Sequence, residues 1–377
     1  MITIETVDLS SKQQVNEFVQ FQYDLYKGVK QFCPPFFNDI KLMLNKNKHP
    51  FFKRSEGEFL VAKKDGKIVG RLGIFINKPF NEYHKVSKAQ FYLFECIDDQ
   101  EVANQLFEAA FAWCRERGMT DVVGPKGLSS FDGYGILVEG YEHRQMMTMM
   151  NYNFDYYPRL LEAIGFEKEV DFVSCYMHAT EFSIPDKVRE VARRVEERGS
   201  FKILSFKNKR QMMRDWADKI GQAYNDTFVN NWEYYPLSQE EVKLLVDNLM
   251  VVADPKLVKI ITYDNEIVGF LLAFPDISEA LQRHNGRITP LAIIDLMLEL
   301  KKTKWVSING AGVLPQFHGR GGMALLYREM EKTVKDYGFV HGEMTQVAET
   351  AVQMRKDLLS LGGQPYKNHR VYRKSLS

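Results

Sequence analysis

The sequence predicts an α/β (or α+β) protein built from two similar units in tandem. Two observations support this: an internal repeat, and the same order of strands and helices in both halves of the 377 residues. The expected domains are residues 1–182 and 201–377, and a linker helix is expected in residues 183–200.

The repeat is clearest in two stretches that are typical of β-hairpins. Residues 59–76 are FLVAKKDGKIVGRLGIFI and residues 258–275 are VKIITYDNEIVGFLLAFP, each two β-rich runs joined by a polar turn. The tripeptide Ile-Val-Gly begins at Ile68 and at Ile267, an offset of 267 − 68 = 199. The stretches LLEAIGFEK and LLSLGGQPY place Gly165 and Gly362 at a similar offset, 362 − 165 = 197, and each glycine ends a helical pattern. Two matches at nearly one offset indicate a duplicated unit.

The first half contains the following expected elements around its hairpin: a strand at 3–7, helices at 11–25 and 37–44, a strand at 88–95, a helix at 100–117, a strand at 121–124, a helix at 156–164, and a last strand that begins near 170. The second half repeats this order around its own hairpin: a strand at 201–206, a helix at 211–224, an inserted helix at 291–301, a strand at 305–313, a helix at 323–337, a strand at 340–345, a helix at 351–361, and a last strand from about 369. In the linker, Val188, Val191, Ala192 and Val195 have the i, i+3, i+4, i+7 spacing of an amphipathic helix, expected to pack between the halves.

Composition and charge exclude several classes of protein. Lys and Arg total 50 against 49 Asp and Glu, a net charge of +1, so no basic excess is present to neutralise a nucleic-acid backbone. The richest apolar stretch, 290–300, contains Asp295 and Glu299, so no membrane partner is expected. The first residues lack a signal-peptide pattern, so a cytoplasmic protein is expected. Four scattered cysteines, and no two histidines at ligand spacing on one element, predict no metal site.

The most specific motif is the run VLPQFHGRGGMALL, residues 313–326, where a predicted strand enters a glycine-rich turn that opens a helix. Glycines let several backbone N–H groups approach one point, and the helix start adds partial positive charge, so the motif suits a pyrophosphate. The spacing does not match a dinucleotide-binding G-x-G-x-x-G motif, because Ala324 occupies the third position, and no Gly-Lys-Ser/Thr follows as in a P-loop. A plain strand–helix connection is the alternative.

This motif resembles the acyl-CoA pyrophosphate loop of the GNAT superfamily of N-acetyltransferases, V-x-P-x-x-Q/R-G-x-G-x-G/A. His318 stands where Gln or Arg is usual, and Met323 stands where a small residue is usual. The resemblance covers nearly the whole chain and implies two GNAT-like domains, each a mixed, mostly antiparallel twisted sheet flanked by helices. It also implies that acetyl-CoA or another acyl-CoA binds to Val313, Leu314, His318, Gly319, Arg320, Gly321, Gly322 and Met323.

The first half departs from the family at the equivalent loop. Its strand leads into Asp98-Asp99-Gln100-Glu101, without glycine and with three acids at a helix start. Acids cap a helix N-terminus and would repel a pyrophosphate, so the first half is expected to be a degenerate copy. The irregular segment 124–153, which contains Met146, Met147, Met149 and Met150, either lines an adaptable apolar site or packs the interface between the halves.

The catalytic groups are the least defined part of the sequence. The glycines Gly310 and Gly312 indicate a β-bulge where the family has its oxyanion donor, and Glu343 on the next strand is the candidate general base. A carboxylate exposed at a strand end is the alternative for Glu343. The family's tyrosine would fall at Leu358, and Tyr327, Tyr366 and Tyr372 remain as unranked substitutes.

The sequence therefore predicts an acyl-CoA-dependent N-acyltransferase that transfers an acetyl group to an amine on a small molecule or peptide. The alternative is a non-catalytic acyl-CoA-binding or scaffold protein that keeps the loop without the acid–base groups.

Overall fold

The computed structural model describes residues 1–129, 132–147, 150–212, 219, 223, 225–227, 229 and 231–377. The chain forms two compact units, and each unit takes segments from both halves of the sequence. Unit 1 comprises Met1–Phe172, Ser278–Met297 and Lys367–Ser377, and unit 2 comprises Val173–Ile277 and Leu298–Tyr366.

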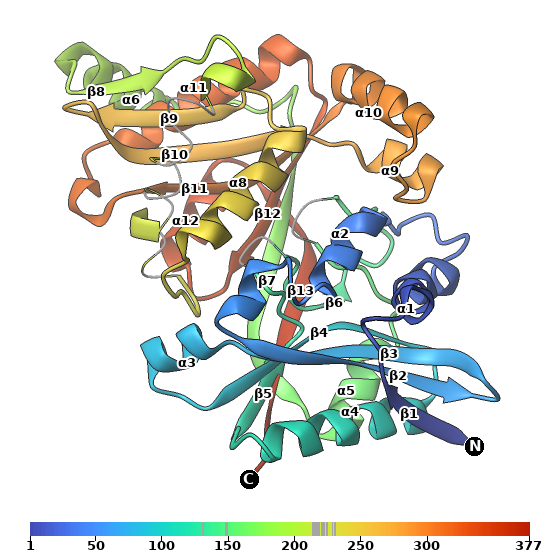
Figure 1. Cartoon of the computed structure of the whole chain (residues 1–377). Coiled ribbons are helices and arrows are strands. Elements are labelled where there is room, and N and C mark those ends of the chain that lie inside the picture. Colours follow the sequence, from blue (N-terminus) through green and yellow to red (C-terminus); the bar gives the residue numbers. More distant parts are fainter. Residues whose placement is uncertain are drawn as a thin grey trace. The chain divides into compact units, whose positions relative to one another are not determined.

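Unit 1 is built on a mixed sheet with the strand order β1-β2-β3-β4-β5-β13-β7, and β6 pairs with β13 (Figure 1). Its elements are β1 (Ile2–Thr6), α1 (Lys12–Leu25), α2 (Phe37–Met43), the 3₁₀ turn η1 (Pro50–Lys53), β2 (Glu56–Lys64), β3 (Lys67–Ile76), α3 (Lys78–His84), β4 (Lys88–Cys96), α4 (Gln100–Arg115), β5 (Asp121–Gly124), β6 (Ile136–Glu139), α5 (Tyr157–Ile164), the start of β7 (Glu167–His178), α9 (Ser278–His284), most of α10 (Pro290–Lys302) and the end of β13 (Gln364–Ser375). Helices α4 and α5 pack on an apolar core that includes Phe91, Phe107 and Phe166.

Unit 2 has the strand order β7-β12-β11-β10-β9-β8. Its remaining elements are α6 (Asp186–Arg198), β8 (Phe201–Leu204), α8 (Gln239–Val252), β9 (Val258–Tyr263), β10 (Glu266–Pro275), β11 (Trp305–Val313), the 3₁₀ turn η2 (Pro315–Phe317), α11 (Gly322–Tyr337), β12 (His341–Ala348) and α12 (Val352–Ser360). The core beneath α11 is formed by side chains such as Val306, Leu326 and Met330. The predicted fold class, a mixed sheet flanked by helices, is confirmed.

The two predicted hairpins form with the same turn chemistry. Asp65 and Gly66 have φ values of 53° and 76°, and Asp264 and Asn265 have φ values of 50° and 68°. Two consecutive residues with positive φ make a type I′ turn, whose twist matches the flanking antiparallel strands. The short polar turns therefore determine where β2 and β3, and β9 and β10, fold back.

The repeat continues beyond the hairpins. The N–H of Ile97 donates to the carbonyl of Val69 at 3.0 Å, and the N–H of Leu314 donates to the carbonyl of Val268 at 2.8 Å. Val69 and Val268 are the repeated valines of the two hairpins, so the chain leaves β4 and β11 in the same way. In each unit the next pairing is parallel, β4 with β5 and β11 with β12.

The last strand of each half contributes to both units. β7 begins in unit 1 and continues into unit 2 from Val173, and β13 begins in unit 2 and enters unit 1 at Lys367. Within unit 1, β13 pairs antiparallel with β5 from Tyr372 opposite Gly124 to Ser375 opposite Asp121. The two compact units are defined by contacts in space and therefore differ from the two duplicated copies in the sequence. The expected domain boundaries at 182 and 200 describe those copies and stay a prediction.

Some elements were not anticipated. Helices α3, α8 and α9 and strand β6 lie in stretches without a clear period, and the predicted helix over 211–224 falls mostly outside the described residues. Helix α6 forms within the predicted linker and packs on α11. Arg328 on α11 makes two hydrogen bonds, of 2.8 and 2.9 Å, to the carboxylate of Glu196 on α6. None of the described helices is both long and apolar enough to cross a bilayer.

Candidate functional site

The glycine-rich loop of unit 2 presents backbone donors at the start of α11. The described hydrogen bonds include none from the backbone N–H groups of Gly319, Gly321, Gly322 and Met323. The first N–H groups of a helix have no partner within the helix, and the helix dipole makes this end partially positive. Arg320 is exposed beside these donors, and its guanidinium lies 5.1 Å from the ring centroid of Phe317. The helix start thus presents backbone donors beside an exposed cation, and anion binding by this loop stays a prediction.

The glycines of the loop serve different purposes. Gly319 has a φ of 72° and a Cβ there would meet open space, whereas a Cβ on Gly321, with a φ of 86°, would lie 2.6 Å from Val195 and 2.9 Å from Val191. A Cβ on Gly322 would lie 2.8 Å from the side chain of Ile261. Gly321 and Gly322 are thus required by the packing of α6 and β9, and sequence reasoning, which assigned all of them to anion approach, missed this cause.

The side chain of His318 stabilises the conformation of the loop through a hydrogen bond. Its Nε2 atom lies 2.8 Å from the carbonyl oxygen of Val313, so the ring donates to that carbonyl. This hydrogen bond closes the turn between the end of β11 and the helix start. We therefore assign His318 a positioning contribution to the predicted acyl-CoA loop, which stays a prediction for all eight of its residues.

Strands β11 and β12 pair only over their first residues. The parallel register runs from Trp305 opposite His341 to Ile308 opposite Met344, although β11 continues to Val313 and β12 to Ala348. Beyond Ile308 the strands are not paired with each other, so backbone N–H and C=O groups become available to an extended ligand with amide groups. An extra residue in β11 opposite Leu272 makes the bulge that the glycines predicted, and Gly310 has a φ of 141°.

A buried polar cluster lies at this divergence of the strands. Ser307 and Glu343 are directly opposite each other, so they share one face of the sheet with Asn309 and Thr345. The hydroxyl of Ser307 donates to the Asn309 Oδ1 at 2.5 Å and lies 3.1 Å from the Thr345 hydroxyl. All four side chains are buried. The cluster was missed, although the alternation of Ser-Ile-Asn and Glu-Met-Thr in two central strands was a usable signal.

The structure ranks the tyrosines that the sequence left unranked. The hydroxyl of Tyr366 donates a short hydrogen bond to Oε2 of Glu343, within unit 2. Tyr327 instead lies with its hydroxyl 3.9 Å from the sulfur of Met354, and Tyr372 belongs to unit 1 and bonds to Glu162. Tyr366 is the tyrosine that the fold brings to the candidate base.

Glu343 and Leu358, two positions considered in the sequence for catalytic groups, are both buried. Glu343 is fully buried, so the alternative of a solvated strand-end carboxylate is wrong. Leu358, where the family tyrosine would stand, is buried in an apolar cluster with Cys175, Met177 and Met344. A hydroxyl at position 358 would therefore have to enter an apolar layer.

The equivalent helix start in unit 1 is already occupied. Asp99 caps α4, and its Oδ1 accepts from the N–H of Glu101 at 3.0 Å and from the N–H of Val102 at 3.4 Å. Asp99 also lies 3.3 Å from Lys64, and Asp98 pairs with Arg159. The backbone donors that α11 leaves available in unit 2 are here bonded to a carboxylate.

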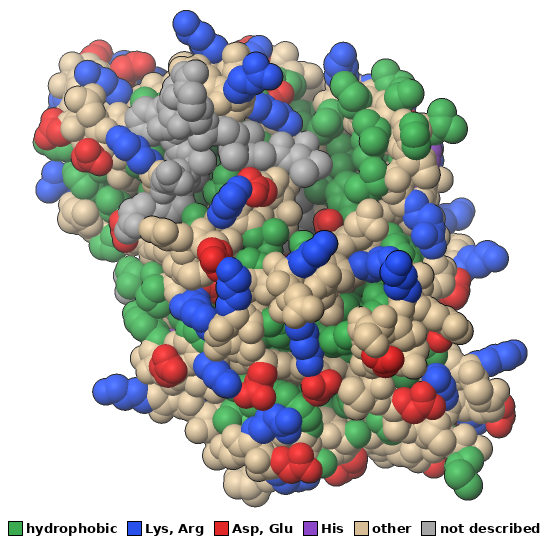
Figure 2. All heavy atoms as spheres, in the orientation of Figure 1, with side chains coloured by type: hydrophobic (Ala, Val, Ile, Leu, Met, Phe, Trp, Pro, Cys, Tyr) green, Lys and Arg blue, Asp and Glu red, His purple; other side chains and the backbone are tan. Residues whose placement is uncertain are grey.

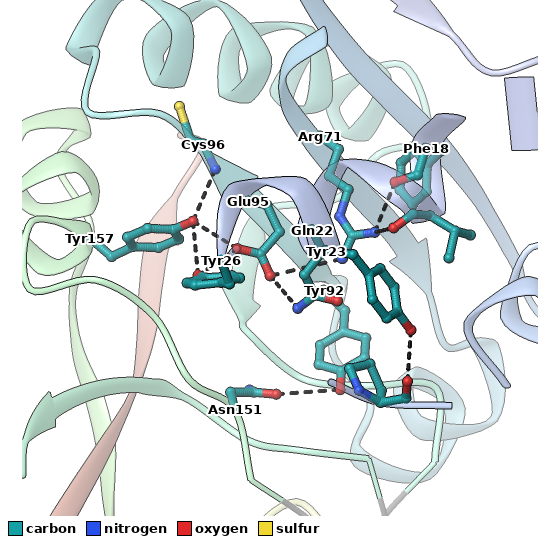
Figure 3. Close-up of polar contacts among 12 residues, drawn as sticks. Phe18, Gln22, Tyr23, Tyr26, Arg71, Tyr92, Glu95, Cys96, Asn151 and Tyr157 are labelled. Carbon is teal, nitrogen blue, oxygen red and sulfur yellow. Dashed lines mark hydrogen bonds and ion pairs between the residues drawn. The ribbon is translucent and has the colours of Figure 1, made fainter. Parts of the chain in front are cut away.

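Unit 1 has its own buried charged cluster, centred on Glu95 of β4 (Figure 3). Oε2 of Glu95 accepts from the hydroxyls of Tyr26 at 2.8 Å and Tyr157 at 2.7 Å, and Oε1 accepts from the amide of Gln22 at 2.6 Å. Arg71 lies 3.8 Å from Oε1. These residues come from α1 and the residue that follows it, and from β3, β4 and α5, so the cluster links two helices to the sheet.

The environment of this cluster is consistent with a structural network. Burial raises the pKa of Glu95, although the Arg71 charge opposes this, and burial raises the pKa of Tyr26 and of Tyr157 well above the usual range. Both tyrosines therefore stay protonated as donors. Arg71 is fully buried and also donates to the carbonyl of Phe18 at 2.9 Å. Sequence reasoning missed the cluster; single charges within the apolar strands RLGIFI and FYLFEC were its only signal.

The described residues of the segment 124–153 belong to unit 1. Asn153 bonds through its side chain to both the N–H and the carbonyl of Leu137, at 2.7 and 3.1 Å. Met146 and Met150 are buried, so they do not form an exposed adaptable surface, and Met149 lies outside the described residues. Among the residues that the structure describes, no group of three or more His, Cys, Asp or Glu side chains could hold a metal ion.

The fold is that of the GNAT acetyltransferases in tandem form. A tandem GNAT protein from the clavulanic acid biosynthesis pathway aligns over 100% of this chain and 99% of its own, with a TM-score of 0.59 and 10% identity. At this identity the likeness establishes the fold and leaves the activity open. The predicted resemblance to the GNAT superfamily is thus confirmed at the level of the fold.

Two relatives match nearly the whole sequence. Protein YghO of Escherichia coli (strain K12) is 25% identical over 97% of this chain and 94% of its own length. The bacterial ceramide synthase of Caulobacter vibrioides is 27% identical over 99% of this chain and 98% of its own length. No protein-family model matches the sequence.

Proposed function

We propose that this protein is an acyl-CoA-dependent N-acyltransferase whose donor binds to unit 2. The observation that supports this most is the contrast between two equivalent helix starts. Gly319, Gly321, Gly322 and Met323 present N–H groups without a described partner at α11, whereas Asp99 occupies the same donors at α4. An anion such as the CoA pyrophosphate is favoured at the first and opposed at the second.

The candidate site fits the length of the donor. Ser307, opposite Glu343, lies 313 − 307 = 6 residues before Val313 on β11. Six residues of strand span roughly 20 Å. An extended phosphopantetheine arm is of similar length, and its two amides can bond to strand edges that no longer pair with each other. The thioester would then lie near the polar cluster.

The proposed reaction is direct transfer from the thioester to the amine. The amine nitrogen attacks the thioester carbon, a C–N bond forms, the C–S bond breaks, and CoA leaves as its thiolate, which takes up a proton. Glu343 accepts the proton that the amine loses, and Tyr366 positions the carboxylate through its hydrogen bond. The bulge at Gly310 directs a backbone donor toward the developing oxyanion.

We further propose that the acceptor is a long-chain amino alcohol and that the donor is a fatty acyl-CoA rather than acetyl-CoA. The support is the relative described as a bacterial ceramide synthase, which matches 99% of this chain. A ceramide is the amide of a long-chain amino alcohol and a fatty acid, so its formation from acyl-CoA is the reaction written above. A small-molecule or peptide amine is the broader acceptor class.

The test is release of free CoA thiol by the full chain. Acetyl-CoA and a long-chain acyl-CoA are each combined with sphinganine, a short alkylamine and a peptide amine. Glu343→Gln is expected to lower kcat by roughly a hundredfold or more, with little change in the KM for acyl-CoA, because a base acts on the amine and not on the pyrophosphate. Tyr366→Phe should have a smaller effect on kcat. Glu266→Gln, an exposed carboxylate on β10, is the matched control and should behave as the parent.

Two results would count against the proposal. Parent-like turnover of Glu343→Gln would remove this residue from the mechanism. Acyl-CoA binding without thiol release from any pair would favour the alternative of a non-catalytic acyl-CoA-binding protein, which the buried Leu358 in place of the family tyrosine supports.

A further inference from the structure

Helix α10 exposes most of its large apolar side chains. Five large apolar residues of this helix are exposed, among them Leu291 at 73%, Met297 at 59% and Ile294 at 57%. Ile293 and Leu298 complete this set, which we call the α10 face, and Ile288 is exposed just before the helix. Figure 2 shows hydrophobic side chains gathered at the upper right, where Figure 1 labels α10.

The inward side of the same helix holds a buried charge beside small and half-buried apolar residues, Leu296 and Leu300 among them. Ala292 is 1% exposed and Glu299 is 3% exposed, and Lys302 lies 3.6 Å from the Glu299 carboxylate. An amphipathic helix usually turns its apolar stripe to the core and its charges to water. A contiguous exposed apolar patch marks a surface that meets an apolar partner.

The acidic side chains of α10 are paired with cations, and one exposed lysine lies at the end of the α10 face. Lys301 is exposed at the end of the helix and has no ion pair among the described residues. Asp295 is already bound by Arg283 at 2.8 Å and by His284 at 3.0 Å, which hold the pKa of its carboxyl below the usual range. A helix with an apolar face and unneutralised lysine suits the boundary of an anionic bilayer, where apolar side chains enter the acyl region and lysine meets phosphate.

We propose that the α10 face docks this protein onto the surface of anionic phospholipid membranes. The choice of a bilayer over a protein partner rests in part on the proposed function, because a long-chain amine and a fatty acyl chain partition into membranes. This departs from the expectation of no membrane partner, which considered only spanning segments. The helix lies on the bilayer and does not cross it.

The test is co-sedimentation of the full chain with vesicles of phosphatidylglycerol and phosphatidylethanolamine in equal parts, and with vesicles of phosphatidylcholine. The parent should bind the anionic vesicles. The triple variant Leu291→Ser, Ile294→Ser, Leu298→Ser should lose affinity by roughly tenfold for each side chain removed from the acyl boundary. Lys301→Glu should weaken binding to anionic vesicles by roughly tenfold and leave binding to phosphatidylcholine unchanged.

The matched control is Val352→Ser with Leu359→Ser, which removes two equally exposed apolar side chains from α12 and should bind as the parent. Absence of vesicle binding by the parent, or parent-like binding by the triple variant, would overturn the proposal. Light scattering that shows a dimer converted to a monomer by the triple variant, without vesicle binding, would assign the face to a second copy instead.

This assay contains no acyl-CoA, so its failure would leave the proposed function intact. Conversely, the triple variant should keep the parent's thiol release on a detergent-solubilised amine. Loss of thiol release in every variant and in the parent would reject the proposed function while leaving vesicle binding as an independent result.

Discussion

His369 is a buried histidine of unit 1 whose imidazole makes a described hydrogen bond through one ring nitrogen. Its Nε2 donates to the carbonyl of Asn151 at 3.0 Å, and the ring is fully buried. Burial lowers the pKa of His369 to about 4, because the protonated ring would lose its hydration. The neutral ring is therefore part of the folded state, and protonation favours the unfolded chain.

We predict that this residue makes the free energy of unfolding fall on acidification. The pKa of His369 is depressed on folding, so its contribution is complete above the usual histidine pKa of about 6.5 and is lost as the pH falls toward 4. The lost contribution is about 3 kcal/mol, from 1.36 kcal/mol per pKa unit. Urea titrations of the parent and of His369→Asn between pH 7 and pH 4 measure it as a difference in slope.

Two carboxyls of unit 1, those of Asp39 and Asp132, act in the opposite sense. Desolvation by neighbouring atoms raises the pKa of the half-buried Asp132 and of the more exposed Asp39 to about 6, so the folded state holds their protons more tightly and gains stability as the pH falls through 6. The parent and His369→Asn both contain Asp39 and Asp132, so the effects of these carboxyls cancel when the pH slopes of the two proteins are compared. Equal pH slopes for the parent and His369→Asn would show that the ring does not remain neutral in the fold.

At the scale of elements, the start of α11 combines two demands on its glycines. Gly321 lies against α6, while Gly319 faces open space at the predicted pyrophosphate site. Gly338 ends the same helix with a φ of 66° and also faces open space. Substitutions at these three positions therefore test different effects. Gly338 tests backbone strain alone, Gly321 adds a packing clash, and Gly319 adds a change at the predicted ligand site.

We predict that Gly319→Ala and Gly338→Ala each lower the free energy of unfolding by about 1 kcal/mol, the cost of a non-glycine residue at positive φ. Only Gly319→Ala should also weaken CoA binding, because its methyl group enters the space above the helix donors. Gly321→Ala should cost more stability, roughly 2 kcal/mol or more, since it also clashes with Val191 and Val195. Calorimetry and urea titration measure both quantities, and CoA affinity unchanged in Gly319→Ala would place the ligand elsewhere.

At the scale of the whole molecule, the two units share a layout but not a binding loop. A duplication without further change would give two CoA sites. Asp98 and Asp99 instead place carboxylates at the α4 start, whereas α11 offers backbone donors and Arg320. The start of α4 is acidic and the start of α11 is not, so unit 2 contains the only CoA site that we propose.

We predict that the full chain binds one CoA. A unit charge near a partly exposed site is worth on the order of 1 kcal/mol or more, and about 1.4 kcal/mol is a tenfold change in affinity, so the acidic cap should suppress a second site. Calorimetric titration should saturate near one equivalent, and Arg320→Glu should weaken that binding by roughly tenfold. Two equivalents of similar affinity, or binding untouched by Arg320→Glu, would contradict the assignment to unit 2.

Strands β7 and β13 limit which forms of the protein can be used to measure the stoichiometry of CoA binding. β7 and β13 each contribute residues to both units. A chain cut between the halves would remove a strand segment from each sheet and expose unpaired backbone groups. Stoichiometry is therefore measured on the full chain with point variants rather than on separated halves.

The tandem fold and most of its elements could be predicted from the sequence alone, because hairpin turns, helix ends and hydrophobic periods are local features. The strand at 305–313 and the helix opening at 322 follow directly from the Val313–Met323 motif. The tertiary structure decided what depends on contacts distant in the chain. Tyr366 contacts Glu343 only because separate segments adjoin in unit 2, and Gly321 is required by a helix more than a hundred residues earlier. Five apolar side chains of α10 lie exposed because burial, unlike periodicity, is set by neighbouring elements.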